Sequence, residues 1–339
     1  MFYLFCFIVS LILLLYVLGY GKNLDNNLIF LMIVLAVGNG GYLALQLSVN
    51  LSEAILANDL TYVSGAFGPL LVFFLICNIC RIRIPNVVRI FLYALQVFVL
   101  VCALTVGKFD FFYKTVEIAN GPQGTYLVKT YGPLHILHLV TLASYTFGGM
   151  IIAFVSMERK NIISRMNVSL LIFINILCVS IYFLERILHL SYEILPLAYN
   201  ISVILMLIPL TKIHIYNVYT NENIVHDELM KTGFIVFGKS LKYMSSNSYA
   251  SELFPELSEW ELEKKIPGSG GKFNTYLRKP LNEYASKNST ETMSGTYSYK
   301  DNVFKYEIEP FYAFRGRRGG YVIKIKDVTD LFDKKKNEE

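Results

Sequence analysis

Charged residues are scarce in this chain of 339 residues, since Asp, Glu, Lys and Arg together make up only 17% of it. Hydrophobic residues make up 54%, and the mean hydropathy is +0.45. These values are too apolar for a water-soluble protein of this length, and they predict extensive contact with a lipid bilayer. The net charge of +5 would suggest nucleic acid as a partner of a soluble protein. No basic and aromatic module of that kind occurs, so we expect no nucleic-acid binding.

Cysteine is also scarce, and all five cysteines lie inside apolar runs: Cys6, Cys77, Cys80, Cys102 and Cys178. Such positions are typical of small buried hydrophobic side chains and argue against a disulfide framework. Cys77 and Cys80 form a Cys-x-x-Cys pair, but the neighbouring Phe-Leu-Ile sequence offers no further ligands for a metal or redox centre. We therefore expect no metal site here.

Long apolar runs fill the chain up to Lys212. A transmembrane helix needs about 20 apolar residues, and seven stretches meet this length: Phe2–Tyr20, Leu28–Val49, Leu60–Cys80, Val87–Thr105, Leu134–Ser156, Met166–Leu184 and Tyr192–Ile213. They predict a seven-helix membrane bundle over residues 1–213. The first run should stay as an anchor, because no basic residue precedes it and no small-residue cleavage site follows it.

The loop charges predict the orientation of this bundle. With the N-terminus outside, the outer loops contain only Lys108, Lys114, Lys129 and Arg186. The cytoplasmic loops then contain Lys22, Arg81, Arg83, Arg89, Arg159, Lys160 and Arg165. Because cytoplasmic loops are enriched in Lys and Arg, we expect a multi-pass membrane protein with its N-terminus outside and its C-terminus in the cytoplasm. In the long outer loop, the sequence Asn-Gly-Pro at residues 120–122 predicts a short hairpin over the bundle.

Polar side chains inside the predicted spans mark places where a ligand or a proton could act, because their burial in hydrocarbon costs free energy. For most of them, close helix packing is the simpler explanation; Asn39, for example, lies in a Gly-Asn-Gly-Gly sequence. Glu185 and Arg186 lie together near the outer end of the sixth span, close to the start of the seventh. We predict four candidate ligand or signal residues there: Glu185, Arg186, Tyr199 and Asn200.

The remainder of the chain has the pattern of a soluble domain. Residues 214–232 continue the helical spacing of the seventh span and predict a connector helix. Residues 233–330 predict one soluble domain, and residues 331–339 a C-terminal tail. Within the domain we expect a helix around Tyr276–Ser286 and a turn over Arg315–Gly320. The expected strands are Phe234–Phe237, Leu241–Met244, Thr296–Lys300, Val303–Phe314 and Tyr321–Asp327. Their alternation predicts an α+β domain in which a five-stranded antiparallel sheet has one packed face.

Two strands, a helical middle and three strands that end in Asp327-Val328-Thr329 resemble a PAS domain. The resemblance rests on Gly233 to Phe237, on Asn247 and Ala250 followed by Leu253-Phe254, and on the closing Asp-x-Thr. The seven-span region is similar to the N-terminal seven-helix region of bacterial histidine kinases and diguanylate cyclases. That similarity rests mainly on four residues of the third span: Tyr62, Gly65, Gly68 and Pro69.

Together, these resemblances imply a receptor in the bacterial inner membrane. A signal at the outer face or within the bundle would shift the last two spans, and the connector would pass the shift to the PAS-like domain. Within that domain, the resemblance implies Asn247, Asp327 and Thr329 as relay residues. It also implies a homodimer, in contact with the lipid bilayer, that acts on a kinase or cyclase effector.

The residues that several activities of such proteins require are missing from this sequence. A flavin adduct needs a cysteine in the PAS-like domain, but none follows Cys178, and a haem ligand is missing because no histidine follows His226. Neither a Gly-rich ATP site nor a cyclase signature occurs. We therefore expect no catalytic residue, no cofactor and no enzymatic activity. Two alternatives stay open, namely the sensory part of a longer histidine kinase or diguanylate cyclase, and a transporter with a regulatory tail.

Overall fold

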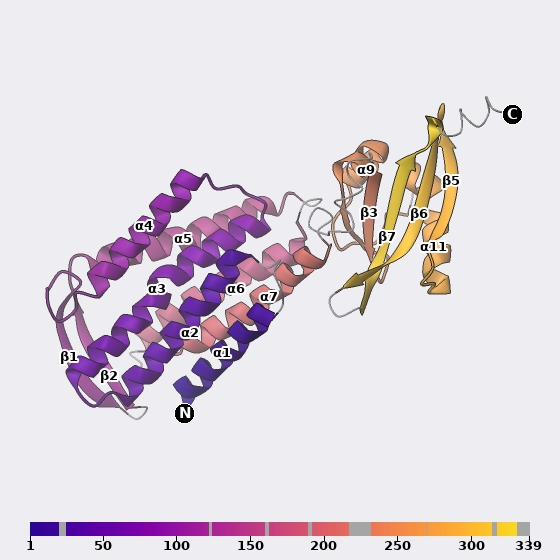
Figure 1. The fold of residues 1–339 in the computed structure, drawn as a ribbon. Coiled ribbons are helices and arrows are strands. Elements are labelled where there is room, and N and C mark those ends of the chain that lie inside the picture. Colours follow the sequence, from indigo (N-terminus) through magenta and orange to yellow (C-terminus); the bar gives the residue numbers. More distant parts are fainter. Residues whose placement is uncertain are drawn as a thin grey trace. The chain divides into compact units, whose positions relative to one another are not determined.

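The computed structural model describes residues 1–19, 25–121, 124–159, 163–188, 192–216, 232–268, 270–313 and 317–330. The chain divides into two compact units. One consists of Met1–Glu158 and Met166–Leu210, and the other of Arg159–Arg165 and Thr211–Glu339. Figure 1 shows that the first unit is built of long helices and that the second contains a β-sheet.

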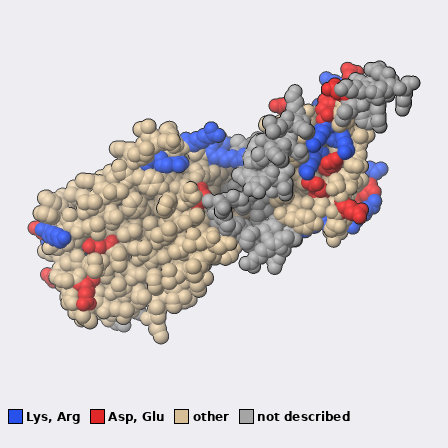
Figure 2. All heavy atoms as spheres, viewed as in Figure 1, with Lys and Arg blue, Asp and Glu red and all other residues tan. Residues whose placement is uncertain are grey.

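Apolar runs form the long helices of the first unit. In the described residues these are α1 (Phe2–Gly19), α2 (Asn26–Leu47), α3 (Leu51–Ile79), α4 (Asn86–Ala103), α5 (His135–Ser156), α6 (Arg165–Ile187) and α7 (Leu195–Tyr216). The first six are long and apolar enough to cross a membrane, and α7 contains a shorter apolar stretch over Leu195–Thr211. Figure 2 shows a broad uncharged surface between charged atoms at the two ends of this unit. The predicted apolar helices are therefore confirmed.

The start of α3 differs from the prediction, since the helix begins at Leu51 rather than at Leu60. The Asn50 side-chain oxygen accepts a hydrogen bond from the backbone N–H of Glu53 at 2.9 Å. In return, the Glu53 carboxylate accepts the backbone N–H of Val49 at 3.1 Å. This reciprocal capping satisfies backbone donors at the helix start. The prediction was wrong because it considered only the length of the apolar run.

The hairpin predicted around residues 120–122 is present, as β1 (Tyr113–Gly121) and the antiparallel β2 (Gly124–Tyr131). Thr125 donates its hydroxyl hydrogen bond to the Ser48 carbonyl, which follows α2, at 2.7 Å. Lys129 donates to the Asn58 side-chain oxygen of α3 at 2.6 Å. Gly124 adopts a φ of +116°, and a Cβ there would lie 2.7 Å from the Gln46 carbonyl oxygen. The hairpin is thus fastened to α2 and α3.

An antiparallel sheet with the strand order β4-β3-β7-β6-β5 forms the second unit. Its strands are β3 (Thr232–Gly238), β4 (Tyr243–Ser246), β5 (Met293–Tyr299), β6 (Asn302–Ala313) and β7 (Arg317–Asp327). Between β4 and β5 the chain forms α9 (Ser248–Leu253), η2 (Pro255–Ser258), α10 (Lys272–Tyr276) and α11 (Arg278–Lys287). Helix residues such as Phe273 and Leu281 pack with Phe237, Ile308 and Ile323 of the sheet in one buried core. This confirms the five-stranded antiparallel sheet.

The prediction of a single packed face is wrong for β3, which is buried at every position. A second buried group on this strand consists of Phe234 and Val236, together with Val322 of β7 and the partly buried Met244. These side chains alternate with Ile235 and Phe237, which belong to the larger core. The continuous apolar sequence Phe-Ile-Val-Phe indicated burial on both faces, because a strand with one wet face alternates apolar with polar residues.

Several boundaries in the second unit also differ from the prediction, and β5 begins at Met293 instead of Thr296. The strand expected at Leu241–Met244 begins at Tyr243, because Leu241 has a φ of +56° and lies in the preceding turn. The helix expected over Tyr276–Ser286 is interrupted at Leu277, whose φ is −115°. Arg317 and Arg318 lie in β7 and not in a turn. Residues 217–231 of the expected connector helix and the tail 331–339 lie outside the described residues.

Candidate functional site

The junction between α6 and α7 is held by two side chains. Glu185, near the end of α6, accepts the backbone N–H of Leu195 at 2.6 Å and also that of Ile194. The Tyr3 hydroxyl of α1 accepts the N–H of Glu193 at 2.9 Å. The first N–H groups of a helix have no partner within it, and a carboxylate at this end interacts favourably with the helix dipole. Glu185 therefore fixes the start of α7 to the end of α6.

Asn200 of α7 takes part in a different contact. Asn39 of α2 donates from its amide nitrogen to the Asn200 side-chain oxygen at 3.2 Å. Asn200 in turn donates to the Cys6 carbonyl of α1 at 2.9 Å. Both asparagine side chains are buried. They join α1, α2 and α7. On α2, the neighbouring Gly38 and Gly41 allow close approach of α3, since a Cβ at Gly38 would lie 2.1 Å from the Ser64 hydroxyl oxygen.

An apolar cavity of about 390 Å³ lies among five helices of the first unit. The lining residues come from α2, α3, α5, α6 and α7, and include Leu35, Pro69, Leu142, Val179 and Met206. None of the described lining residues carries a charge. Tyr199, one of the predicted signal residues, lines this cavity. It is therefore an uncharged space in the membrane unit.

A few polar side chains line the α6 and α7 side of the cavity: Asn175, Cys178, Tyr182, Tyr199 and Ser202. The Cys178 sulfur lies 3.2 Å from the Ser202 hydroxyl oxygen, and the Asn175 amide donates to the Leu171 carbonyl at 2.9 Å. Among the described residues, by contrast, no side chain or backbone group makes a hydrogen bond to the Tyr199 hydroxyl. The cavity thus combines apolar walls with a hydroxyl that has hydrogen-bonding capacity left.

Two aromatic side chains show where the cavity reaches the surface. Phe147 of α5 and Phe183 of α6 both line it, and each is 55% exposed. Because the surface of this unit faces hydrocarbon, the opening between α5 and α6 faces lipid. On α3, a Cβ built at Gly68 would meet nothing within 4 Å. Two of the four residues that carried the family resemblance, Gly68 and Pro69, therefore form part of the cavity wall.

Proline interrupts the hydrogen bonding of α7 beyond the cavity. Met206 lines the cavity, and Pro209 follows it inside the helix. Proline has no N–H, so it cannot donate to the carbonyl of Leu205 one turn earlier. A missing backbone hydrogen bond is a usual place for a helix to bend. This point lies between the cavity and the C-terminal end of α7.

In the second unit, the predicted relay residue Asn247 connects β3 to α9. Its side-chain oxygen accepts the backbone N–H of Phe234 at 2.9 Å and that of Ala250 at 3.0 Å. Its amide donates to the Thr232 carbonyl at 2.8 Å. Asn247 is buried, and a Cβ at Gly233 would approach Ala250 Cα to 3.3 Å. One side chain therefore joins the first strand of this unit to the helix that covers it.

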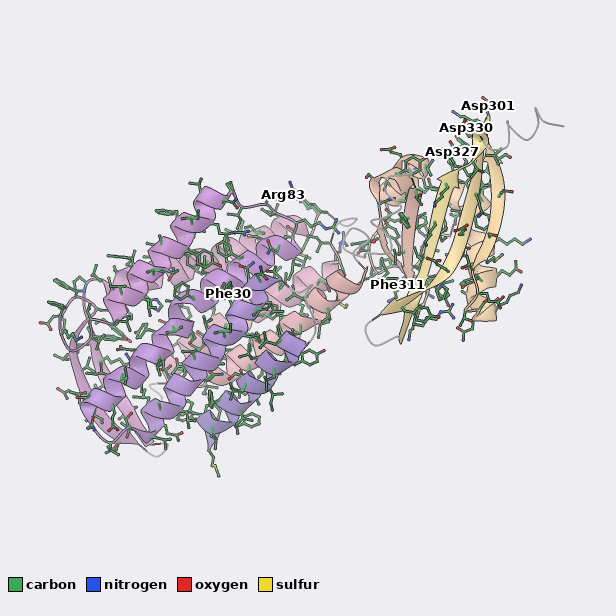
Figure 3. All side chains as sticks on the ribbon, in the orientation of Figure 1. Phe30, Arg83, Asp301, Phe311, Asp327 and Asp330 are labelled. Atoms are coloured by element: carbon green, nitrogen blue, oxygen red, sulfur yellow. The ribbon has the colours of Figure 1, made fainter. Side chains whose placement is uncertain are left out.

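Asp327 and Thr329, the other predicted relay residues, join the end of β7 to the start of β6. Asp327 accepts the backbone N–H of Thr329 at 3.0 Å and its hydroxyl at 2.5 Å. The Thr329 hydroxyl oxygen accepts the backbone N–H of Val303 at 3.0 Å. Figure 3 shows Asp327 and Asp330 at one end of the sheet and Phe311 towards the other. Thr232 pairs with Lys326, so the chain enters and leaves the sheet at this same end.

The structure does not gather the four predicted signal residues into one site. Glu185 holds the helix junction, Tyr199 lines the cavity and Asn200 contacts α1 and α2, while the side chain of Arg186 lies outside the described residues. A role in ligand binding stays a prediction for all four. Sequence reasoning missed the cavity, although Asn175, Cys178 and Tyr182 share one helical face of α6.

No group of three or more His, Cys, Asp or Glu side chains could hold a metal ion in the part of the chain that the structure describes. Comparison with curated proteins gave no match. Comparison with protein families gave a match to the N-terminal 7TM region of histidine kinase over residues 2–219. This match covers more than half of the chain and includes all the long helices of the first unit. The chain is thus a multi-pass membrane protein with a sensory region, and it belongs to the family of N-terminal 7TM regions of histidine kinase.

Proposed function

We propose that this protein is a membrane receptor in which a signal reaching the helical unit shifts α6 and α7, and in which the second unit relays that shift. The family supports a sensory role. The observation that carries the relay is the course of α7, which is fixed to α6 at its start, lines the cavity along its length and contains Pro209 before its end. A change in the cavity would bend α7 most easily at that proline.

The second unit would act as a PAS-like relay. Its strand order β4-β3-β7-β6-β5, with α9, η2, α10 and α11 between β4 and β5, supports the resemblance to a PAS domain. A displacement of α7 would reach β3 through the connector, residues 214–232. From there, Asn247 would pass it to α9, and Asp327 with Thr329 would pass it to the segment after β7. The hydrogen bonds of these three side chains support that role.

The remaining parts of the proposal concern location and partners. The protein would lie in a bacterial inner membrane, and the distribution of Lys and Arg supports an N-terminus outside and a C-terminus in the cytoplasm. Dimerisation through the connector and the second unit would place two relays side by side. The output would reach a separate histidine kinase or diguanylate cyclase, which would carry the catalytic site. The family description also supports an alternative, in which these residues are the sensory part of a longer histidine kinase.

Hydrogen exchange in the full chain, reconstituted in lipid nanodiscs, tests the relay. Pro209→Ala restores a backbone donor inside α7 and should stiffen the helix beyond the cavity. The matched control is Pro196→Ala, because Pro196 lies in the first turn of α7, where N–H groups have no intrahelical partner. If α7 is coupled to β3, the exchange rates of residues 232–238 should differ about fivefold between Pro209→Ala and the unsubstituted chain, since one backbone hydrogen bond contributes about 1 kcal/mol. Pro196→Ala should leave these rates unchanged. Unchanged exchange there would contradict the relay.

A further inference from the structure

The cavity among the membrane helices has the properties of a small-molecule site. Its volume of about 390 Å³ falls in the range of roughly 300–1,000 Å³ that such sites occupy. Its walls are predominantly apolar, with Leu, Val, Ile, Phe and Met side chains from five helices. Apolar cavities of this kind stay dry and take up apolar molecules. Because no described lining residue is charged, a charged ligand would lose its hydration without gaining a partner.

The polar groups of the lining limit the ligand further. Tyr199 lines the cavity close to the pair formed by Cys178 and Ser202. The Cys178 and Ser202 side chains contact each other, whereas the Tyr199 hydroxyl has no hydrogen-bond partner among the described residues. A hydroxyl that is removed from water without a partner costs free energy. A ligand with a neutral oxygen would provide that partner.

We propose that this cavity binds a neutral molecule with an alkyl chain and a single hydroxyl or carbonyl group, whose oxygen bonds to the Tyr199 hydroxyl. The inference rests on the proposed sensory function and names the ligand class of its site. Such molecules concentrate in the bilayer, and the opening between Phe147 and Phe183 faces that phase. Occupation of the cavity brings the ligand against α6 and α7, the two helices that carry the relay.

Photolabelling of the full chain in nanodiscs tests this proposal. The probe is a medium-chain n-alkanol with a diazirine at the end of its chain, and mass spectrometry identifies the labelled residues. We expect saturable labelling of lining residues such as Cys178 and Met206, which excess 1-decanol suppresses and excess decanoate does not. Ala143→Leu fills part of the cavity and should weaken labelling roughly tenfold, the effect of losing the burial of about two methylenes. Ala94→Leu adds the same volume on the exposed surface of α4 and should change nothing.

Tyr199→Phe tests the polar contact separately. It should weaken labelling by the alkanol roughly fivefold, the value of one hydrogen bond, and leave labelling by a diazirine alkane of equal length unchanged. Non-saturable labelling, or equal labelling in Ala143→Leu, would overturn the proposal and would mean that lipid chains alone contact these residues. If the alkanol labels the cavity saturably but Pro209→Ala leaves hydrogen exchange of residues 232–238 unchanged, the ligand assignment stands and only the relay is contradicted. If Pro209→Ala changes that exchange but labelling is not saturable, only the ligand assignment is contradicted.

Discussion

Replacement of Asn247 by alanine should weaken the second unit at the point where the chain enters it. The substitution removes the acceptor of the Phe234 N–H at 2.9 Å, the acceptor of the Ala250 N–H at 3.0 Å and the donor to the Thr232 carbonyl at 2.8 Å. An unpaired buried N–H costs about 1–3 kcal/mol, and loss of a helix N-cap costs about 1 kcal/mol. Together, these effects predict a loss of about 3 kcal/mol in the local free energy of opening.

Hydrogen exchange of the full chain in nanodiscs measures this loss directly. Because about 1.4 kcal/mol corresponds to a factor of ten, the protection of the β3 and α9 amides should fall about a hundredfold. Asn302→Ala serves as the control, since the Asn302 side chain is exposed and, among the described residues, donates one 3.3 Å hydrogen bond, to Asp327. This control should change protection by no more than about 0.5 kcal/mol. A fall of less than about threefold for Asn247→Ala would refute the argument from buried hydrogen bonds.

Three further predictions concern other contacts. Glu185→Gln should lower the local free energy of opening at the start of α7 by about 1 kcal/mol, because a neutral oxygen binds the Leu195 N–H more weakly than a carboxylate does. Hydrogen exchange measures this loss, and equal exchange rates would argue against the role of Glu185. Asn39→Leu should destabilise the helical unit by about 0.6 kcal/mol in detergent unfolding, the average for hydrogen bonds between membrane helices, and a stabilised unit would show that Asn200 needs no partner. Burial raises the pKa of Tyr297 above its ordinary 10.0, so the folded form holds that proton more tightly than the unfolded form. The free energy of unfolding should therefore be unaffected below pH 10.0 and fall above it. Tyr297→Phe should make this fall smaller, with tyrosinate absorbance reporting the ionisation. An identical pH profile of stability in the variant would contradict the prediction.

Much of the fold could be predicted because its signals are local. Apolar runs of spanning length predict the helices, and alternating residues predict β5, β6 and β7. The errors arise where a second effect decides. Asn50 and Glu53 cap α3 ahead of its apolar run, and the positive φ of Leu241 delays β4 without any glycine to mark it. For β3, the uninterrupted apolar run was a usable signal of burial on both faces.

The candidate site could be predicted only in part. The end of α6 and the start of α7 are close in sequence, so the nearness of Glu185 to the start of α7 follows from chain order. Tyr199 and Asn200 are adjacent in sequence, yet consecutive residues of a helix point about 100° apart. One of them therefore lines the cavity while the other bonds to α1 and α2. The cavity itself arises from the packing of five helices, which no single segment specifies.

The common position of Thr232 and Lys326 at one end of the sheet has a consequence for how such a protein can be rearranged. The residue at which the chain enters β3 and the residue at which it leaves β7 are neighbours, although the whole sheet separates them in the sequence. Residues 232–327 could then be removed or exchanged as a block with little change in the distance between the two points that have to be joined. In that arrangement, the sheet domain would be an insertion between two points of the chain that could also be joined directly.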